Sequence, residues 1–313
     1  MPRWRSRRRR KKKRTRGESR AFPFGEKRSL LRQVSARAAD GAADTIAPMD
    51  LHPCILHEPP VDFSFTLLHE DGALLAVSKS GDLPCHPAGK YRAHTLLAAL
   101  ASAGWRGLFP VHRLDRETSG VVVLAKSVDT ARRLGKSLEA GRFRKRYLLL
   151  ADGPWPAPHG AWVEAAGFVC PVSTPEIHRF RAFRRELAPG ERGQRACTRF
   201  RLLARNGERC LLEAVPLTGR IHQIRASAKA LGLAVVGDKL YGRDPGVYAR
   251  LCNGIRPTAA DDALLGMARQ ALHAWKLSFP HPETGRRVSL LAPWPEDMRA
   301  ALRAGGDAAG TGE

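Results

Sequence analysis

One aspartate stands out as a candidate reactive group in this chain. Asp115 lies in the polar segment His112–Gly120, between Arg113 and Arg116, and the mostly apolar run Val121–Lys126 follows directly. This layout places a carboxylate on a short loop that a buried strand holds rigid, as a nucleophile or a general base requires. The alternative is a tight turn whose aspartate is neutralised by neighbouring arginines, which is the commoner situation for an acidic side chain.

A second segment, Pro216–Arg225, combines a turn with positive charge. Thr218 and Gly219 form the turn, and the pattern that follows predicts a helix over residues 221–231. Amides at a helix N-terminus attract phosphate, and Arg220 and Arg225 lie on different parts of the predicted helix surface. One arginine could therefore meet a carboxylate while the other meets phosphate. The alternative is a surface helix with ordinary solvated arginines.

The pattern of apolar and turn residues predicts an α+β protein. Helices and strands alternate without a strict βαβ order, which favours a mixed, mostly antiparallel central sheet with flanking helices over a doubly wound parallel sheet. Turn signals and apolar runs predict a hairpin over 66–79 around an Asp-Gly turn, further strands over 120–126, 145–151, 197–203 and 210–216, and helices over 95–103, 127–141 and 221–231.

The charge distribution divides the chain and indicates a polyanionic partner. The 313 residues carry a net charge of +23, and residues 1–20 contain twelve Lys and Arg against one Glu. We expect residues 1–47 to be a basic, disordered N-terminal extension, residues 48–303 to be the folded domain, and residues 304–313 to be a flexible tail. The remaining body is itself basic, so a polyanionic partner is plausible even without the extension, although a basic surface also fits membrane or heparin binding.

Composition also bounds the location and the cofactors. No apolar stretch approaches the roughly 20 residues that span a bilayer, which predicts a protein without a membrane partner. The six cysteines form no C-x-x-C pair and no zinc spacing with histidine, so we interpret them as reduced thiols in the cytoplasm and expect no metal site.

Both segments, taken with four others in the same order, resemble the RluA-type RNA pseudouridine synthases. The second segment resembles the L-x-T-G-R-x-H-Q-I-R motif of that family, with Ile221 at its variable position. The other segments are Lys79–Pro87, Lys145–Tyr147, Gly237–Gly242, and the pair Leu272–Ala274 and Phe279–Pro282. The resemblance spans about residues 62–295. It implies the pseudouridine synthase fold and the isomerisation of specific uridines in structured RNA, in an rRNA or tRNA stem-loop.

The resemblance also implies roles for individual residues. Asp115 would be the catalytic carboxylate and Arg225 its ion-pair partner. Tyr147 would stack on the uracil and assist proton removal at C5, while Ile224 would pack against the other side of the base. Arg113 would fill the space that a flipped nucleotide leaves or bind a neighbouring phosphate. The expected RNA-binding arginines are Arg113, Arg116 and Arg220.

Further expectations concern cofactors, the oligomeric state and the positions that depart from the family motifs. The isomerisation adds no group and changes no oxidation state, so the resemblance implies no metal, organic cofactor or nucleotide cofactor. We expect a monomer, and we expect His112 to be structural. Ser80 and Cys85 depart from the usual Pro and Val of their segment, where we expect changes in packing only, and residues 1–60 lack the apolar periodicity of the S4-type RNA-binding module that many relatives carry.

Three other functions remain open on the sequence. The chain could be an RNA-binding ribosome-assembly factor that keeps the fold without turnover, although Asp115, Tyr147 and Arg225 are all present. It could be a hydrolase of N-glycosidic bonds, which would release free uracil. It could also be a purely electrostatic binder, in which case deleting residues 1–47 would abolish all function.

Overall fold

The structure is a computed structural model that describes residues 58–172, 180–244, 246–253, 255 and 258–305. The predicted extension 1–47 and nearly all of the predicted tail 304–313 lie outside the described residues, so those two expectations stay predictions. None of the helices in the described ranges is long and apolar enough to cross a bilayer.

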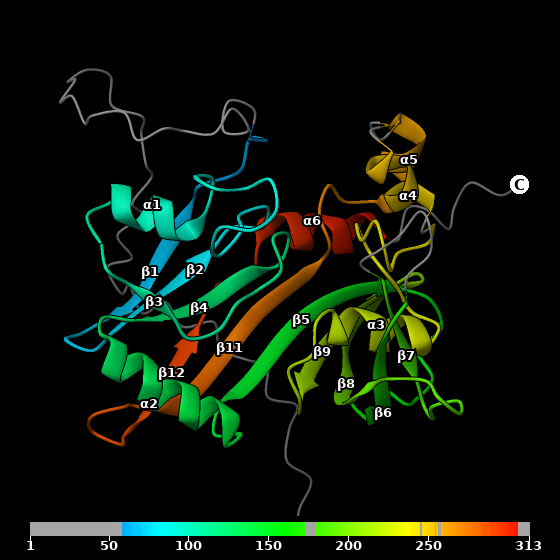
Figure 1. Cartoon of the computed structure of the whole chain (residues 1–313). Helices are drawn as coiled ribbons and strands as arrows, with labels where there is room; N and C mark the ends of the chain where they lie inside the picture. The colour runs from blue at the N-terminus through cyan, green and yellow to red at the C-terminus, as the bar shows by residue number, and fades with distance from the viewer. Residues whose placement is uncertain (1–57, 173–179, 245, 254, 256–257, 306–313) are drawn as a thin grey trace, which may run out of the picture. The chain divides into compact units, whose positions relative to one another are not determined.

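Twelve strands in the described part of the chain form one sheet (Figure 1). Its main order is β1-β2-β4-β11-β5-β9-β8-β6-β7, with β3 beside β4, β10 beside β5 and β12 beside β11. The strands are β1 Phe65–Glu70, β2 Leu74–Lys79, β3 Phe109–Pro110, β4 Ser119–Ala125, β5 Arg144–Asp152, β6 Trp162–Pro171, β7 Arg181–Arg184, β8 Gln194–Asn206, β9 Arg209–Pro216, β10 Ala234–Val235, β11 Leu272–Pro280 and β12 Arg287–Leu291.

All strand pairs are antiparallel except β4 with β11, which are parallel. This confirms the predicted fold class of a mixed, mostly antiparallel sheet with flanking helices. The helices are α1 Leu96–Ser102, α2 Val128–Glu139, α3 Gln223–Ala230, α4 Gly246–Cys252, α5 Ala259–Leu265 and α6 Glu296–Ala304.

The strand β4 lies in the interior of the sheet, between β2 and β11, for a reason visible in its sequence. Every residue from Ser119 to Ala125 is buried, as a continuous apolar run requires when both faces of a strand are covered. Gly120 has a φ of 109°, and a Cβ there would lie 2.3 Å from the carbonyl oxygen of Ala274. Only glycine therefore allows β4 and β11 to approach this closely at the end of the Asp115 loop.

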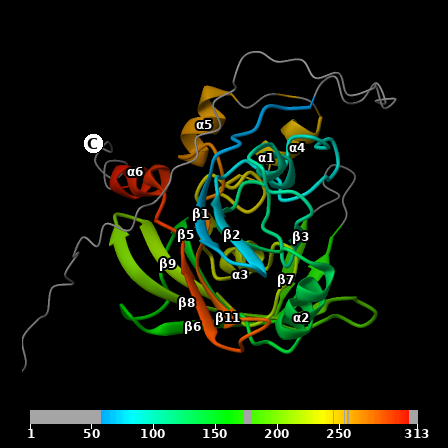
Figure 2. The same cartoon turned by 90° about the vertical axis from the view of Figure 1, so that its left-hand side faces the viewer.

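The two faces of the sheet are covered by different helices. On one face, α3 packs through Ile224 and Ala228 against Phe200 of β8 and Leu212 of β9. On the other, α6 packs through Met298 and Ala301 against neighbouring residues such as Leu211 of β9. Successive side chains of a strand point to opposite faces, so α3 and α6 lie on opposite sides of β8 and β9 (Figure 2).

Most predicted elements are present, with shifts at the ends. The hairpin is β1–β2, and Asp71 accepts hydrogen bonds from the amides of Ala73 and Leu74 in its turn. The helix expected over 221–231 begins at Gln223 instead, because His222 adopts a left-handed conformation with φ 57°. Arg220 is therefore not on the helix, and the prediction that it shares the helix surface with Arg225 was wrong.

Candidate active site

The loop that carries Asp115 is fixed by its backbone. The amide of Thr118 donates to the carbonyl of Asp115 at 3.0 Å, which closes a turn. The carbonyl of Arg116 accepts two hydrogen bonds, one from the amide of Leu83 at 3.0 Å and one from Nζ of Lys79 at 3.0 Å. The reactive loop is thus bound at its centre to the end of β2.

Lys79 is a buried cation that serves this loop. Its side chain is 1% exposed, and Nζ also donates to the carbonyl of Ser80 at 2.9 Å. Burial lowers the pKa of Lys79 to about 8. The hydrogen bonds to the carbonyls of Ser80 and Arg116 compensate part of the cost of burying the charge.

Arg225 connects Asp115 to a second carboxylate. Its Nη1 donates to Oδ2 of Asp115 at 2.9 Å, while Nε and Nη2 donate to the two carboxylate oxygens of Asp238 at 2.6 and 2.8 Å. The bidentate partner is therefore Asp238, and Asp115 receives a single hydrogen bond. The guanidinium plane is fixed by Asp238, and this fixes the one N–H group that points to Asp115.

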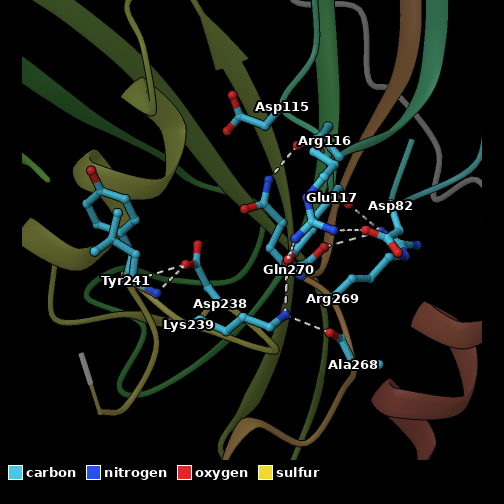
Figure 3. A network of polar contacts seen from close by, with 12 residues as sticks. Asp82, Asp115, Arg116, Glu117, Asp238, Lys239, Tyr241, Ala268, Arg269 and Gln270 are labelled. Atoms are coloured by element: carbon cyan, nitrogen blue, oxygen red, sulfur yellow. Dashed lines mark hydrogen bonds and ion pairs between the residues drawn. The ribbon is translucent and has the colours of Figure 1, made fainter. Parts of the chain in front are cut away.

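Asp238 is itself held from several directions. Its Oδ1 accepts from the amides of Leu240 and Tyr241, both at 2.9 Å (Figure 3), and its side chain has no exposed surface. The preceding Gly237 has a φ of 69°, and a Cβ there would lie 1.9 Å from the carbonyl oxygen of Arg269. The Arg225 guanidinium lies over the ring of Tyr241, with Cζ 4.8 Å from the ring centroid.

This arrangement keeps both carboxylates ionised. Burial is the largest single influence on the pKa of Asp115 and would raise it, but the charge of Arg225 and the hydrogen bonds to the carboxylate together outweigh burial, and the pKa lies below its ordinary value. Burial likewise opposes ionisation of Asp238, and Arg225 together with the amides of Leu240 and Tyr241 lowers the pKa of that carboxyl. Asp115 keeps 30% of its side chain exposed and Asp238 none. Asp115 is therefore an accessible carboxylate, ready to act as a nucleophile or base.

The loop before α3 is arranged around Gln223. Its Oε1 accepts from Oγ1 of Thr218 at 2.7 Å and from the amide of Arg220 at 3.0 Å. Its Nε2 donates to the carbonyl of Cys197 at 3.0 Å. His222 follows this loop, and burial lowers its pKa to about 4, so the imidazole is neutral at pH 7.

These groups surround a cavity of about 470 Å³. Asp115 and Arg225 lie in its wall together with further side chains, namely Arg113, Lys145, Tyr147, Arg181, Arg220, Ile221, His222 and Ile224. A cavity of this volume is within the range that takes a small ligand. A second cavity of about 540 Å³ shares Arg113, Asp115 and Arg225 and continues to Tyr91 and Lys239.

Tyr147 and Ile224 supply the apolar part of the wall. Tyr147 is half-buried on β5, and burial followed by the nearby Asp115 carboxylate raises the pKa of its phenol. The ring is therefore a neutral phenol at pH 7, which suits stacking better than proton abstraction. Ile224 is 7% exposed and belongs to the core beneath α3 while it borders the cavity.

The structure brings six of the seven predicted site residues to one cavity. Arg113 is exposed there, and its side chain has no hydrogen bond or ion pair with the described residues. Arg116 is the exception, because it forms ion pairs with Asp82 and Glu117 (Figure 3). Its guanidinium also lies over the ring of Tyr91.

One partner of Arg116, Glu117, belongs to a wider network. Glu117 also accepts from Nζ of Lys239 at 3.1 Å and from the amide of Gln270 at 3.1 Å, and Gln270 donates to Oγ1 of Thr118 at 2.6 Å. Arg116 therefore braces the Asp115 loop. Its side chain also borders the second cavity and keeps 36% of its surface exposed, and its role as an RNA-binding arginine stays a prediction.

The sequence analysis missed Asp238 and Lys79 as site residues. Both residues lie in segments that resemble the family. Their roles depend on the burial of their side chains, and the sequence around a single Asp or Lys does not show whether that side chain is buried. His112 is as expected: Nε2 accepts from the amide of Val123 at 3.3 Å, and burial lowers its pKa to about 3. Among the described residues, no group of three His, Cys, Asp or Glu side chains could hold a metal ion.

Comparisons with known proteins identify the family of this chain. The family model described as RNA pseudouridylate synthase matches residues 73–230. The chain is 33% identical over 244 residues to the ribosomal large subunit pseudouridine synthase D of Nitrosomonas europaea, which covers 76% of this chain and 64% of that protein. It is also 33% identical over 260 residues to an uncharacterized RNA pseudouridine synthase of Mycobacterium bovis, covering 80% of this chain and 76% of the relative.

A solved structure has the same fold. The human RNA pseudouridylate synthase domain containing 1 superposes with a TM-score of 0.60 at 24% identity. The superposition covers 78% of this chain and 90% of the human one. The likeness therefore extends over most of the described sheet and its helices.

Proposed function

Because this chain belongs to the RNA pseudouridylate synthase family, whose enzymes are isomerases, we propose that Asp115 is the carboxylate with which it converts specific uridines of structured RNA to pseudouridine. The observation that carries this proposal is the ion pair between Arg225 and Asp115 in the wall of a cavity large enough for one nucleoside. The substrate is a stem-loop of rRNA or tRNA. rRNA is the first candidate, since it is the substrate class in the name of the Nitrosomonas relative.

The chemistry requires little beyond an ionised carboxylate and a closed pocket. The N1–C1′ bond breaks, the uracil turns, and a C5–C1′ bond forms while C5 loses its proton and N1 gains one. Asp115 acts either as a nucleophile at C1′ or as the base that removes the C2′ proton. Both routes need the ionised form, which the lowered pKa of Asp115 favours.

The other cavity residues hold the nucleotide. Tyr147 stacks on the uracil and Ile224 packs on its other side, while the base is turned. The target uridine must leave its stack to enter the cavity, which costs a few kcal/mol. Arg113 is free to fill the space that the uridine leaves or to bind a phosphate. Arg220 contacts the RNA backbone at the mouth of the cavity.

The remaining parts of the proposal concern the protein as a whole. We place the catalytic domain at residues 48–303, acting as a monomer in the cytoplasm, without a metal, an organic cofactor or a nucleotide cofactor. A monomer suffices because Asp115, Arg225 and Tyr147 all belong to one chain and line one cavity.

The test is carbodiimide mapping of pseudouridine in total RNA from cells with and without the gene. We expect one or a few sites to disappear and to return with the wild-type gene but not with Asp115→Ala. An unchanged pseudouridine map in both rRNA and tRNA would contradict the proposed activity. The mapping also names the RNA and the modified position.

A further inference from the structure

A strip of arginines crosses the sheet on the face opposite the cavity. Tyr147 and Phe200 point to the α3 face, so their alternating neighbours on β5 and β8 point to the other face. The neighbours are basic, and the exposed Trp162 of β6 lies beside them. The arginine strip consists of Arg144 and Arg146 of β5 and Arg195, Arg199 and Arg201 of β8.

The strip is left uncovered by the helices of the described part of the chain. α6 covers the same face farther along the strands, at Leu148, Leu150 and Leu211. Arg144, Arg195 and Trp162 are exposed, and Arg146 and Arg199 have 50% and 45% of their side chains accessible. In Figure 2 the exposed part of β8 and β6 lies below α6.

Three of the five arginines, Arg146, Arg199 and Arg201, are paired with carboxylates. The buried Glu213 of β9 accepts from Nη1 of Arg146 at 2.9 Å and also pairs with Arg201, so one carboxylate holds arginines from both neighbouring strands. Glu164 lies 3.8 Å from Arg199. Five guanidinium groups against two carboxylates leave the strip with a net positive charge, which favours a polyanion.

An aromatic ring lies within the charged strip. Trp162 is 38% exposed, and Cζ of Arg199 and Arg201 lie 5.2 and 4.8 Å from its ring centroid. An indole flanked by guanidinium groups is the combination on which unpaired bases stack while the phosphates meet the arginines. An acidic protein surface would use the charges but would not need the ring.

The strip is continuous with the mouth of the cavity. Nε of Arg220, which lines the cavity, donates to the carbonyl of Arg195 at 3.1 Å. Arg199 pairs with Val215, and Pro216, the next residue of β9, also lines the cavity. An RNA chain that leaves the cavity at this end therefore reaches the arginine strip by passing around the ends of β8 and β9.

We propose that the arginine strip and Trp162 bind an unpaired segment of the substrate RNA that flanks the modified stem-loop. This inference rests on the proposed function for the nature of the substrate. It adds a second RNA contact, on the reverse face of the sheet, that selects RNAs with single-stranded flanks. Arg195 and Arg199 contact phosphates and Trp162 stacks on a base.

The experiment measures binding by fluorescence anisotropy for two RNAs, a bare stem-loop with uridines in its loop and the same stem-loop with an unpaired tail of about ten nucleotides. Wild type should bind the tailed RNA at least tenfold more tightly. Arg195→Glu/Arg199→Glu should abolish that difference and leave the affinity for the bare stem-loop within twofold of wild type. Trp162→Ala should remove part of it.

The matched control is Arg286→Glu/Arg287→Glu, which makes the same change in net charge at exposed residues of the β11–β12 turn. It should retain the advantage of the tailed RNA. For the strip variant, the loss of two phosphate contacts should also reduce the slope of log affinity against log salt by about 1.4. Equal losses in the strip variant and the control, or equal losses on both RNAs, would overturn the proposal.

Turnover is measured separately on the bare stem-loop that carries the mapped uridine. At saturating RNA, the strip variant should isomerise it at the wild-type rate, because Arg195 and Arg199 lie outside the reacting cavity. If wild type forms no pseudouridine, the proposed function fails while the binding comparison still decides the second contact. If turnover is normal and the tail adds no affinity, only the second contact fails.

Discussion

The orientation of Arg225 depends on Asp238, and this dependence gives a quantitative prediction. Asp238→Asn keeps the size of the side chain but removes its charge and one of its two guanidinium hydrogen bonds. Asp115 would remain the only carboxylate bonded to Arg225. We expect the guanidinium to turn toward Asp115 and to bind it more tightly, which withdraws the carboxylate from C1′ or the C2′ proton.

The magnitude follows from the burial of the pair. Arg225 is 9% exposed and Asp238 is not exposed, so removing the charge should cost about 3–5 kcal/mol of stability. One hydrogen bond to a charged group is worth about 1.5–3 kcal/mol. If the transition state loses the same free energy because Arg225 is no longer held in position, turnover per folded molecule falls roughly 10- to 150-fold, since about 1.4 kcal/mol corresponds to a factor of ten in rate.

The assay is single-turnover release of tritium from RNA that contains [5-³H]uridine, with the folded fraction measured by circular dichroism. Asp261→Asn is the matched control, because Asp261 is also a buried carboxylate paired with an arginine, Arg250, but lies outside the cavity. The control should lose stability and keep its turnover per folded molecule. Unchanged turnover in Asp238→Asn would refute the idea that Asp238 positions Arg225.

Three further variants test other parts of the site. Arg225→Lys should lose far more activity than Lys229→Arg, and the acid limb of its kcat/KM profile should move to higher pH, because the lysine keeps the positive charge but loses the fixed guanidinium hydrogen bond that helps to lower the pKa of Asp115; equal profiles would exclude the ion pair. Tyr147→Phe should retain RNA binding and release tritium at near the wild-type rate, because the neutral phenol acts by stacking; a loss of about 100-fold would contradict this and show that the hydroxyl relays a proton. The folded-state pKa of His112 is about 3, below the value of about 6.5 in unfolded chains, so protons favour the unfolded state and stability falls as the pH drops below 6.5. In urea titrations, the free energy of unfolding of His112→Gln should therefore fall less steeply with decreasing pH than that of wild type, by up to about 1.4 kcal/mol per pH unit. The same pH dependence in both proteins would contradict the buried neutral imidazole.

The sequence predicted the parts of the fold that depend on local patterns. The buried run of β4 and the turn at Asp71 have direct signatures, and both are present in the structure. β6 and α6 were not predicted. α6 carries acidic residues in its first turn and Arg303 in its last, which are readable signals, but its place against the sheet depends on contacts far apart in the chain.

The site was predictable to the extent that its residues share short segments. Asp115 and Arg225 were paired through the resemblance, and the structure places them 2.9 Å apart. The bidentate contact of Arg225, however, is made to Asp238, a partner that the sequence did not reveal. The reason is the burial of Asp238, whose enclosed carboxylate accepts from the guanidinium and from two backbone amides at once.

The most direct test of the central claim is tritium release by purified Asp115→Asn, measured with RNA binding on the same preparation. The variant keeps the size of the side chain and one acceptor oxygen for Nη1 of Arg225, but it cannot attack C1′ or accept the C2′ proton as a carboxylate does. We expect affinity for RNA within a few-fold of wild type and tritium release slowed by at least about 10³-fold. Release near the wild-type rate would show that another group performs the chemistry.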